Sequence, residues 1–89
     1  MLVGVCEDDA SIRRLLANTL DFAGHEVRAA HDGAEALRLF GADSAVDVIV
    51  MDIGLPDSDG RDVVTALRSA GQHAPVLFLT ALGGLHAGA

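Results

Sequence analysis

Three short apolar runs, each followed directly by a polar residue, constrain the fold of this chain more than any other feature. The runs are Leu2–Cys6, Val46–Met51 and Pro75–Leu79. Apolar runs of this length, bounded by loop residues, are typical of strands that are buried on both faces. They therefore predict the central strands of a parallel sheet that is covered by helices.

The segments between the apolar runs predict three helices and one further strand. Apolar residues recur at helical spacing over Ser11–Ala23, from a capping Asp32 to about Phe40, and over Asp62–Ser69. Glu26–Ala30 is short and alternating, which favours a strand. Strands that alternate with helices through short loops indicate an α/β fold, with a parallel sheet and helices on both faces.

The helical periodicity also predicts which side chains face the sheet. In the first helix we expect Ile12 and Leu15 to be covered, with Arg13 and Arg14 on a solvated face. In the second helix we expect Leu37 to be buried with its apolar neighbours. Gly24 and Gly71 are the expected stops of the first and third helices.

Composition limits the function classes. The chain has 89 residues, 13 of them acidic and 6 basic, with a net charge of −7, and all six basic residues are Arg. A single small acidic domain is a poor candidate for direct binding of nucleic acid or of an anionic membrane. The single Cys6 excludes an internal disulfide and favours a reducing compartment, so we expect an inert core thiol and a cytoplasmic location.

Polar side chains follow each apolar run, where sites form in parallel sheets. Glu7 and Asp8 follow the first run, Asp52 follows the second, and Thr80 follows the third. If the first and second of these strands are neighbours, the carboxylates converge and repel one another, and a divalent cation relieves that repulsion. Oxygen-only ligands favour Mg²⁺, which can also hold a phosphoryl group.

Four stretches resemble the receiver domain of response regulators in two-component signalling, and they occur in the order of that family. The stretches are VGVCEDDASIRRLL, AAHDGAEAL, VIVMDIGLPDSDGRDVV and PVLFLTA. The resemblance implies a flavodoxin-like parallel sheet, here shortened to four strands in the order 2-1-3-4 when numbered along the chain.

The resemblance also implies a role for each matching residue. Asp52 matches the aspartate that accepts a phosphoryl group from a histidine kinase, and Thr80 matches the hydroxyl that senses it. Asp8, Glu7 and the backbone carbonyl of Gly54 match the Mg²⁺ ligands, together with Asp52. Such a domain controls an effector domain, usually a regulator of transcription, which this chain does not contain.

The sequence departs from the family in its last part. The family's phosphoryl-binding Lys is absent, because the chain has no Lys. We expect one receiver-like domain over residues 1–89 that lacks the fifth strand and the last helix. The Pro75–Thr80 strand would then have a bare edge, and one sheet face would keep only the Ser11–Ala23 helix. Such surfaces predict self-association or low stability.

Two alternatives stay open. The missing Lys favours a pseudo-receiver that is not phosphorylated and acts as an interaction or dimerisation module. A Mg²⁺-dependent phosphatase would use a second acid two residues after its nucleophile, where this chain has Gly54. We therefore expect a signalling domain and not an enzyme with an external substrate.

Two further acidic features have local structural interpretations. Asp9 is expected to cap a helix, and Asp57–Gly60 to form a turn and not a calcium loop.

Overall fold

Five strands form one sheet in the order β2-β1-β3-β4-β5 in the computed structural model, which describes residues 1–80 and the backbone of 85–87. Four of them run parallel: β1 (Leu2–Cys6), β2 (Glu26–Ala30), β3 (Val48–Asp52) and β4 (Val76–Leu79). Their order confirms the predicted 2-1-3-4 arrangement. Cys6 pairs with Met51, so β1 and β3 end side by side and the residues that follow them share one edge of the sheet.

A short fifth strand corrects one expectation. β5 (Leu85–Ala87) pairs with β4 in the antiparallel direction, so the prediction of a bare β4 edge is wrong. An unpaired strand edge presents backbone N–H and C=O groups that need partners, and the chain itself supplies them here. The sequence after Thr80 has three Gly in nine residues and so does not favour a firm helix, but residues 81–84 and 88–89 lie outside the described residues.

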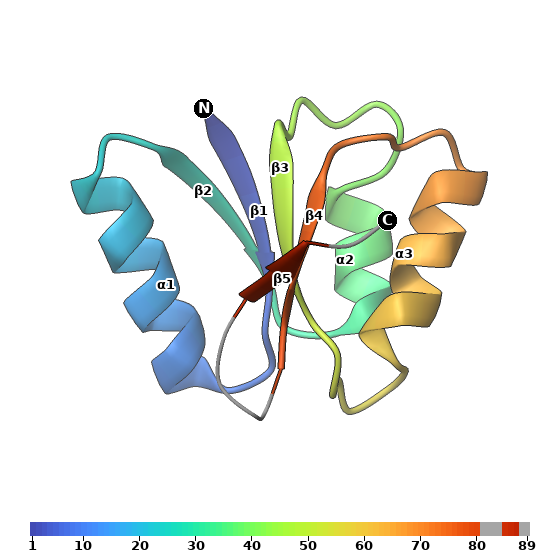
Figure 1. The fold of residues 1–89 in the computed structure, drawn as a ribbon, viewed down its shortest axis with the longest axis horizontal. Helices are drawn as coiled ribbons and strands as arrows, with labels where there is room; N and C mark the ends of the chain where they lie inside the picture. Colours follow the sequence, from blue (N-terminus) through green and yellow to red (C-terminus); the bar gives the residue numbers. More distant parts are fainter. Residues whose placement is uncertain (81–84, 88–89) are drawn as a thin grey trace.

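In the part of the chain that the structure describes, three helices cover the sheet, as predicted, on both faces. Figure 1 shows α1 (Ala10–Phe22) on one side of the strands, and α2 (Gly33–Leu39) and α3 (Gly60–Ser69) on the other. Each helix begins after an aspartate that accepts backbone hydrogen bonds from its first turn; these N-caps are Asp9, Asp32 and Asp59. The capping role expected for Asp9 is confirmed.

Two glycines end helices as predicted. Gly24 follows α1 with φ of 93°, and Gly71 follows α3 with φ of 96°. Residues other than glycine rarely adopt this left-handed backbone conformation. The two glycines therefore fix where the chain leaves each helix.

The buried core is divided unequally between the two faces. On the α2 and α3 side, Phe40, Ile49, Met51 and Leu67 are almost fully enclosed, within the larger of two clusters. Among the described side chains, the cluster on the α1 side is smaller: it consists of Val3, Val5 and Val50, with Leu16 and Leu20 of α1 packed against it. The fold is therefore stabilised mainly from the α2 and α3 side.

The predicted burial of several helical side chains is wrong. Ile12 and Leu15 of α1 are 42% and 66% exposed, and Leu37 of α2 is 41% exposed. One helix on a sheet touches it along a narrow stripe, here through Leu16 and Leu20. No second helix flanks α1 on this face within the described residues, so the sides of its apolar stripe remain open (Figure 1).

Candidate functional site

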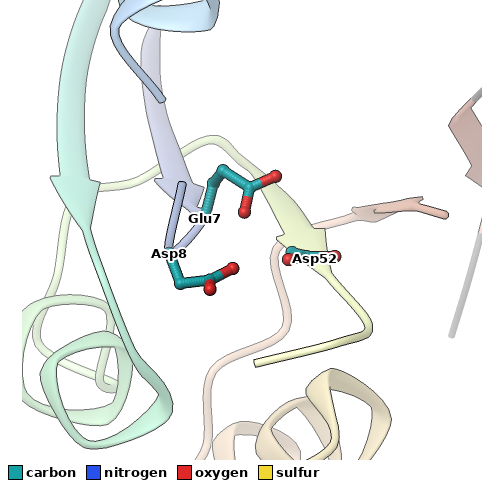
Figure 2. A group of neighbouring side chains, drawn as sticks. All are labelled: Glu7, Asp8 and Asp52. Atoms are coloured by element: carbon teal, nitrogen blue, oxygen red, sulfur yellow. The ribbon is translucent and has the colours of Figure 1, made fainter. Parts of the chain in front are cut away.

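Three carboxylates meet at the carboxyl edge of the central strands. Glu7 and Asp8 follow β1, Asp52 ends β3, and one oxygen from each lies within 4.8 Å of the others. Figure 2 shows the three side chains directed toward one region from these two strands. The convergence predicted from adjacent strands is thus present in the geometry.

An open cavity of about 640 Å³ lies beside this cluster. Its lining brings together every residue that the sequence analysis singled out for the site; the lining residues are Glu7, Asp8, Asp9, Ile12, Asp52, Ile53, Gly54, Leu79 and Thr80. Thr80 directly follows β4, which places it beside the end of β3. Residues at or just after the ends of β1, β3 and β4, together with Ile12 of α1, therefore line a single solvent-accessible space.

The loop after β1 is held by a hydrogen-bond network of its own. The Asp9 amide donates to Glu7 Oε2 at 3.1 Å, while Asp9 Oδ1 accepts from the amides of Ser11 at 2.9 Å and Ile12 at 3.0 Å. The carboxyl group of Glu7 is therefore oriented by the same residue that begins α1.

Arg13 is a site-supporting residue that the sequence analysis missed. Its Nη1 donates to the backbone carbonyls of Glu7 at 2.9 Å and Asp8 at 3.2 Å. The expectation that Arg13 lies on a solvated helix face is therefore wrong, although Arg14 is exposed. An arginine one turn into a helix reaches back over the N-cap, and that contact depends on the loop path and leaves no signal in the periodicity.

The loop after β3 is fixed at both of its ends. The Gly54 amide donates to Asp52 Oδ1 at 3.2 Å, and the Gly60 amide donates to the Ile53 carbonyl at 2.8 Å. The Ile53 amide in turn donates to the Leu79 carbonyl at 3.2 Å. These bonds place the carboxylate of Asp52 and the backbone of Gly54 at the same rim of the cavity.

Burial makes Glu7 the unusual acid of the cluster. Glu7 is only 4% exposed, and this burial raises the pKa of its carboxyl group to about 7. Hydrogen bonding with the neighbouring Asp52 and Asp8 side chains raises the pKa in the same direction, and the bond from the Asp9 amide opposes it. Near neutral pH the Glu7 carboxyl is therefore partly protonated, and a bound divalent cation would favour its charged form.

The donor set fits Mg²⁺. Three carboxylates offer hard oxygen ligands at close range, Asp8 is exposed to water, and Asp52 is half-buried. Mg²⁺ is bound by a few protein oxygens with water in its remaining positions. In contrast, Cys6 is buried and not a ligand of this type: burial raises the pKa of its thiol to about 12, and Sγ donates to the Asp32 carbonyl at 3.4 Å.

A parallel sheet of this order, with an acidic cavity at the ends of its central strands, defines a flavodoxin-like α/β domain. Residues 3–87 match the family model of the response regulator receiver domain. The chain belongs to the response regulator receiver domain family. The predicted family and fold class are confirmed.

Among curated relatives, Response regulator MprA of Mycobacterium avium (strain 104) is 41% identical over 96 residues. The match covers the whole of this chain and 42% of that relative. The chain thus spans about two fifths of the length of the relatives that it matches.

Solved receiver structures superpose closely on the chain. The Francisella response regulator 1452 receiver domain gives a TM-score of 0.83 at 34% identity, covering 93% of this chain and 68% of that one. TrrA from Thermotoga maritima, solved in complex with Mg²⁺ and BeF, gives 0.82 at 32% identity, covering 90% and 69%. TrrA in complex with the histidine kinase ThkA gives 0.82 at 31% identity, covering 93% and 71%.

None of the helices in the described part of the chain is long and apolar enough to cross a membrane.

Proposed function

We propose that this chain is a phosphoacceptor receiver domain in which Asp52 accepts a phosphoryl group from a histidine kinase. The observation that carries the proposal is the meeting of Glu7, Asp8 and Asp52 on one cavity that Thr80 also lines. Family membership supports the same function.

In the proposed step, a carboxylate oxygen of Asp52 attacks the phosphorus of a phosphohistidine. The new P–O bond forms as the P–N bond breaks. The imidazole, protonated on its other ring nitrogen, takes the electron pair of the P–N bond and leaves as a neutral base. Bound Mg²⁺ would neutralise charge on the transferring phosphoryl oxygens. Glu7 and Asp8, with Asp52 and the Gly54 carbonyl, are the groups that would hold the metal, since they border the cavity.

Thr80 is the proposed sensor of the product. Its position directly after β4 and on the cavity lining lets a hydroxyl donate to a phosphoryl oxygen on Asp52. Because Thr80 directly follows β4, which is paired to β3, a shift of the hydroxyl would be transmitted to β4.

A histidine kinase is the proposed partner and phosphoryl donor. The TrrA–ThkA complex supports this choice, because TrrA is similar to this chain over most of its length. The longer MprA relatives support an effector domain elsewhere in the parent protein, which we propose regulates transcription in the cytoplasm.

We also propose that residues 1–89 self-associate through the α1 face. Ile12, Leu15 and Phe22 are exposed on α1, and Phe22 is 94% exposed. The buried cluster beneath that face is the smaller of the two formed by the described residues. Sedimentation should then show a concentration-dependent dimer that Leu15→Glu weakens; a monomer at high concentration would remove this proposal.

The phosphoacceptor proposal is tested by intact mass after incubation with a small acyl phosphate, with and without Mg²⁺. We expect a gain of one phosphoryl group that requires Mg²⁺ and disappears in Asp52→Asn. Asp21→Asn is the matched control, because Asp21 lies at the end of α1, away from this cavity.

The same experiment decides between the two candidate functions. No gain of mass in folded wild-type protein would instead favour the non-phosphorylated pseudo-receiver, for which the absence of any Lys is the favouring observation.

A further inference from the structure

Asp57 joins the loop after β3 to the start of a helix on another part of the chain. Its Oδ1 accepts from the Gly33 amide at 2.8 Å, and its Oδ2 accepts from the Ala34 amide at 3.0 Å. Both amides belong to the first turn of α2, and they lie 24 and 23 residues before Asp57. These bonds lower the pKa of the Asp57 carboxyl, so the carboxylate is charged at neutral pH.

Close packing at Gly33 reinforces the same junction. A Cβ added to Gly33 would overlap Ser58 Oγ, and it would lie 2.9 Å from Val63 Cγ2 and 3.2 Å from Asp57 Oδ1. The loop therefore rests directly on the backbone of α2. A Cβ at residue 33 would require Ser58 and Val63 to shift, so the close packing and the hydrogen bonds favour the same loop position.

The junction lies in the loop that carries Gly54. Leu55 is buried, and Gly54 forms an isolated bridge with Asp59, the N-cap of α3. The ends of the loop are thus bonded to β3 and α3, and its middle is bonded to α2 through Asp57. Loss of the Asp57 bonds would remove the anchor at the middle of the loop, and Gly54 is joined to that part of the loop through its bridge with Asp59.

We propose that Asp57 is a positioning residue for the metal site: by bonding the first turn of α2, it holds the Gly54 backbone at the rim of the acidic cavity. This inference rests on the proposed Mg²⁺ site, and it adds a residue that does not touch the metal. Its effect would pass through the loop to the Gly54 carbonyl, and so Asp57 would act on affinity and not on the chemistry of phosphoryl transfer.

The test uses Asp57→Ala and Gly33→Ala, alone and together, in the full 89-residue chain. Gly33→Ala displaces the loop from the other side of the same junction. Asp62→Ala is the matched control, because it removes the same charge from an exposed position in the first turn of α3. Titration calorimetry with MgCl₂ alone measures the dissociation constant, and urea unfolding shows that each variant is folded.

We expect Asp57→Ala to raise the Mg²⁺ dissociation constant roughly tenfold, the lower end of the range for residues that support metal ligands. Gly33→Ala should weaken binding too, and the double variant should lose less than the product of the two single effects. Asp57→Asn keeps one acceptor oxygen, so its affinity should be intermediate.

A second readout needs no metal. Without Mg²⁺, the amides of Gly33 and Ala34 should exchange with solvent faster in Asp57→Ala than in Asp62→Ala. Equal Mg²⁺ affinity in Asp57→Ala and wild type, or equal losses in Asp57→Ala and Asp62→Ala, would overturn the role of Asp57. Wild type that binds no Mg²⁺ would overturn the proposed metal site and this role together, whereas unchanged amide exchange would overturn the role alone.

Discussion

Gly60 packs against the backbone of Asp52 so closely that a Cβ at residue 60 would overlap the Asp52 carbonyl oxygen. The same Cβ would lie 2.9 Å from the Asp52 carbonyl carbon and 3.0 Å from Met51 Cγ. The first residue of α3 is therefore seated on the end of β3. This contact sets how α3 leaves the strand that presents the proposed phosphoacceptor.

Gly60→Ala should lower the free energy of unfolding by about 1–3 kcal/mol, because the obstacle is backbone and cannot turn aside as a flexible side chain would. It should also weaken Mg²⁺ binding by displacing Asp52. Gly54→Ala is the control, since a Cβ there meets nothing within 4 Å. Urea unfolding checks the prediction, and equal stability of the two variants would contradict it.

The fold could be predicted because the spacing of apolar residues agrees with the positions of the helix caps and glycine stops along the chain. The sequences of β1, β3 and β4 are apolar because these strands are buried. Each helix is marked in the sequence by a capping aspartate or by a glycine stop. The errors concern what covers an element. Periodicity places Leu15 and Leu37 on apolar stripes, but it does not say whether a neighbour lies beside the stripe.

The candidate site could be predicted in its carboxylates but not in its supports. Glu7, Asp8 and Asp52 lie at strand ends, so topology alone brings them together. Arg13 and Asp57 act by bonding backbone groups of loops and helix ends. Such contacts depend on loop paths in space, and residue type and spacing carry no signal for them.

The buried acid predicts a pH-dependent cost to stability. The pKa of Glu7 is about 7 in the folded chain, against its ordinary value of 4.5. Between these values the folded state keeps a proton that the unfolded state has lost, so this group lowers the free energy of unfolding as pH rises from 4.5 to about 7. Above about pH 7 this loss in the free energy of unfolding stays constant, and below pH 4.5 there is no loss.

Glu7→Gln should therefore stabilise the metal-free chain by about 1–3 kcal/mol near pH 8 and leave it unchanged near pH 4. Mg²⁺ should stabilise wild type more than the variant, because the variant lacks one ligand. Urea unfolding at the two pH values, with and without MgCl₂, measures both effects. A variant that is less stable than wild type at the higher pH would show that the carboxylate is not costly there.

Arg13→Ala should weaken Mg²⁺ binding several-fold, because its guanidinium holds the carbonyls of Glu7 and Asp8 in the loop that carries both acids. Arg14→Ala is the control, since it removes the same charge from the next position, which is exposed. Calorimetric titration with MgCl₂ compares the two. Equal losses would assign the effect to charge and not to the position of the loop.

The last prediction concerns Gln72, which lies near the amino ends of the strands, whereas the site lies at their carboxyl ends. Gln72 is buried between α3 and β4, and its Nε2 donates to the carbonyls of Phe40 at 2.9 Å and Gly41 at 3.1 Å. Its Oε1 accepts from the Ala74 amide at 2.9 Å. One amide side chain thus bonds the end of α2 to the segment that leads into β4.

Gln72→Leu should destabilise the chain by about 2–3 kcal/mol, because it leaves buried backbone groups without their partner while adding some apolar contact. Phosphoryl transfer to Asp52 and Mg²⁺ affinity should not change in the folded fraction, since the substitution lies beyond the starts of the strands. His73→Ala, at an exposed neighbouring position, is the control and should have little effect. Urea unfolding combined with intact-mass phosphorylation checks both parts, and a loss of Mg²⁺ affinity in folded Gln72→Leu would show that the two edges of the sheet are coupled.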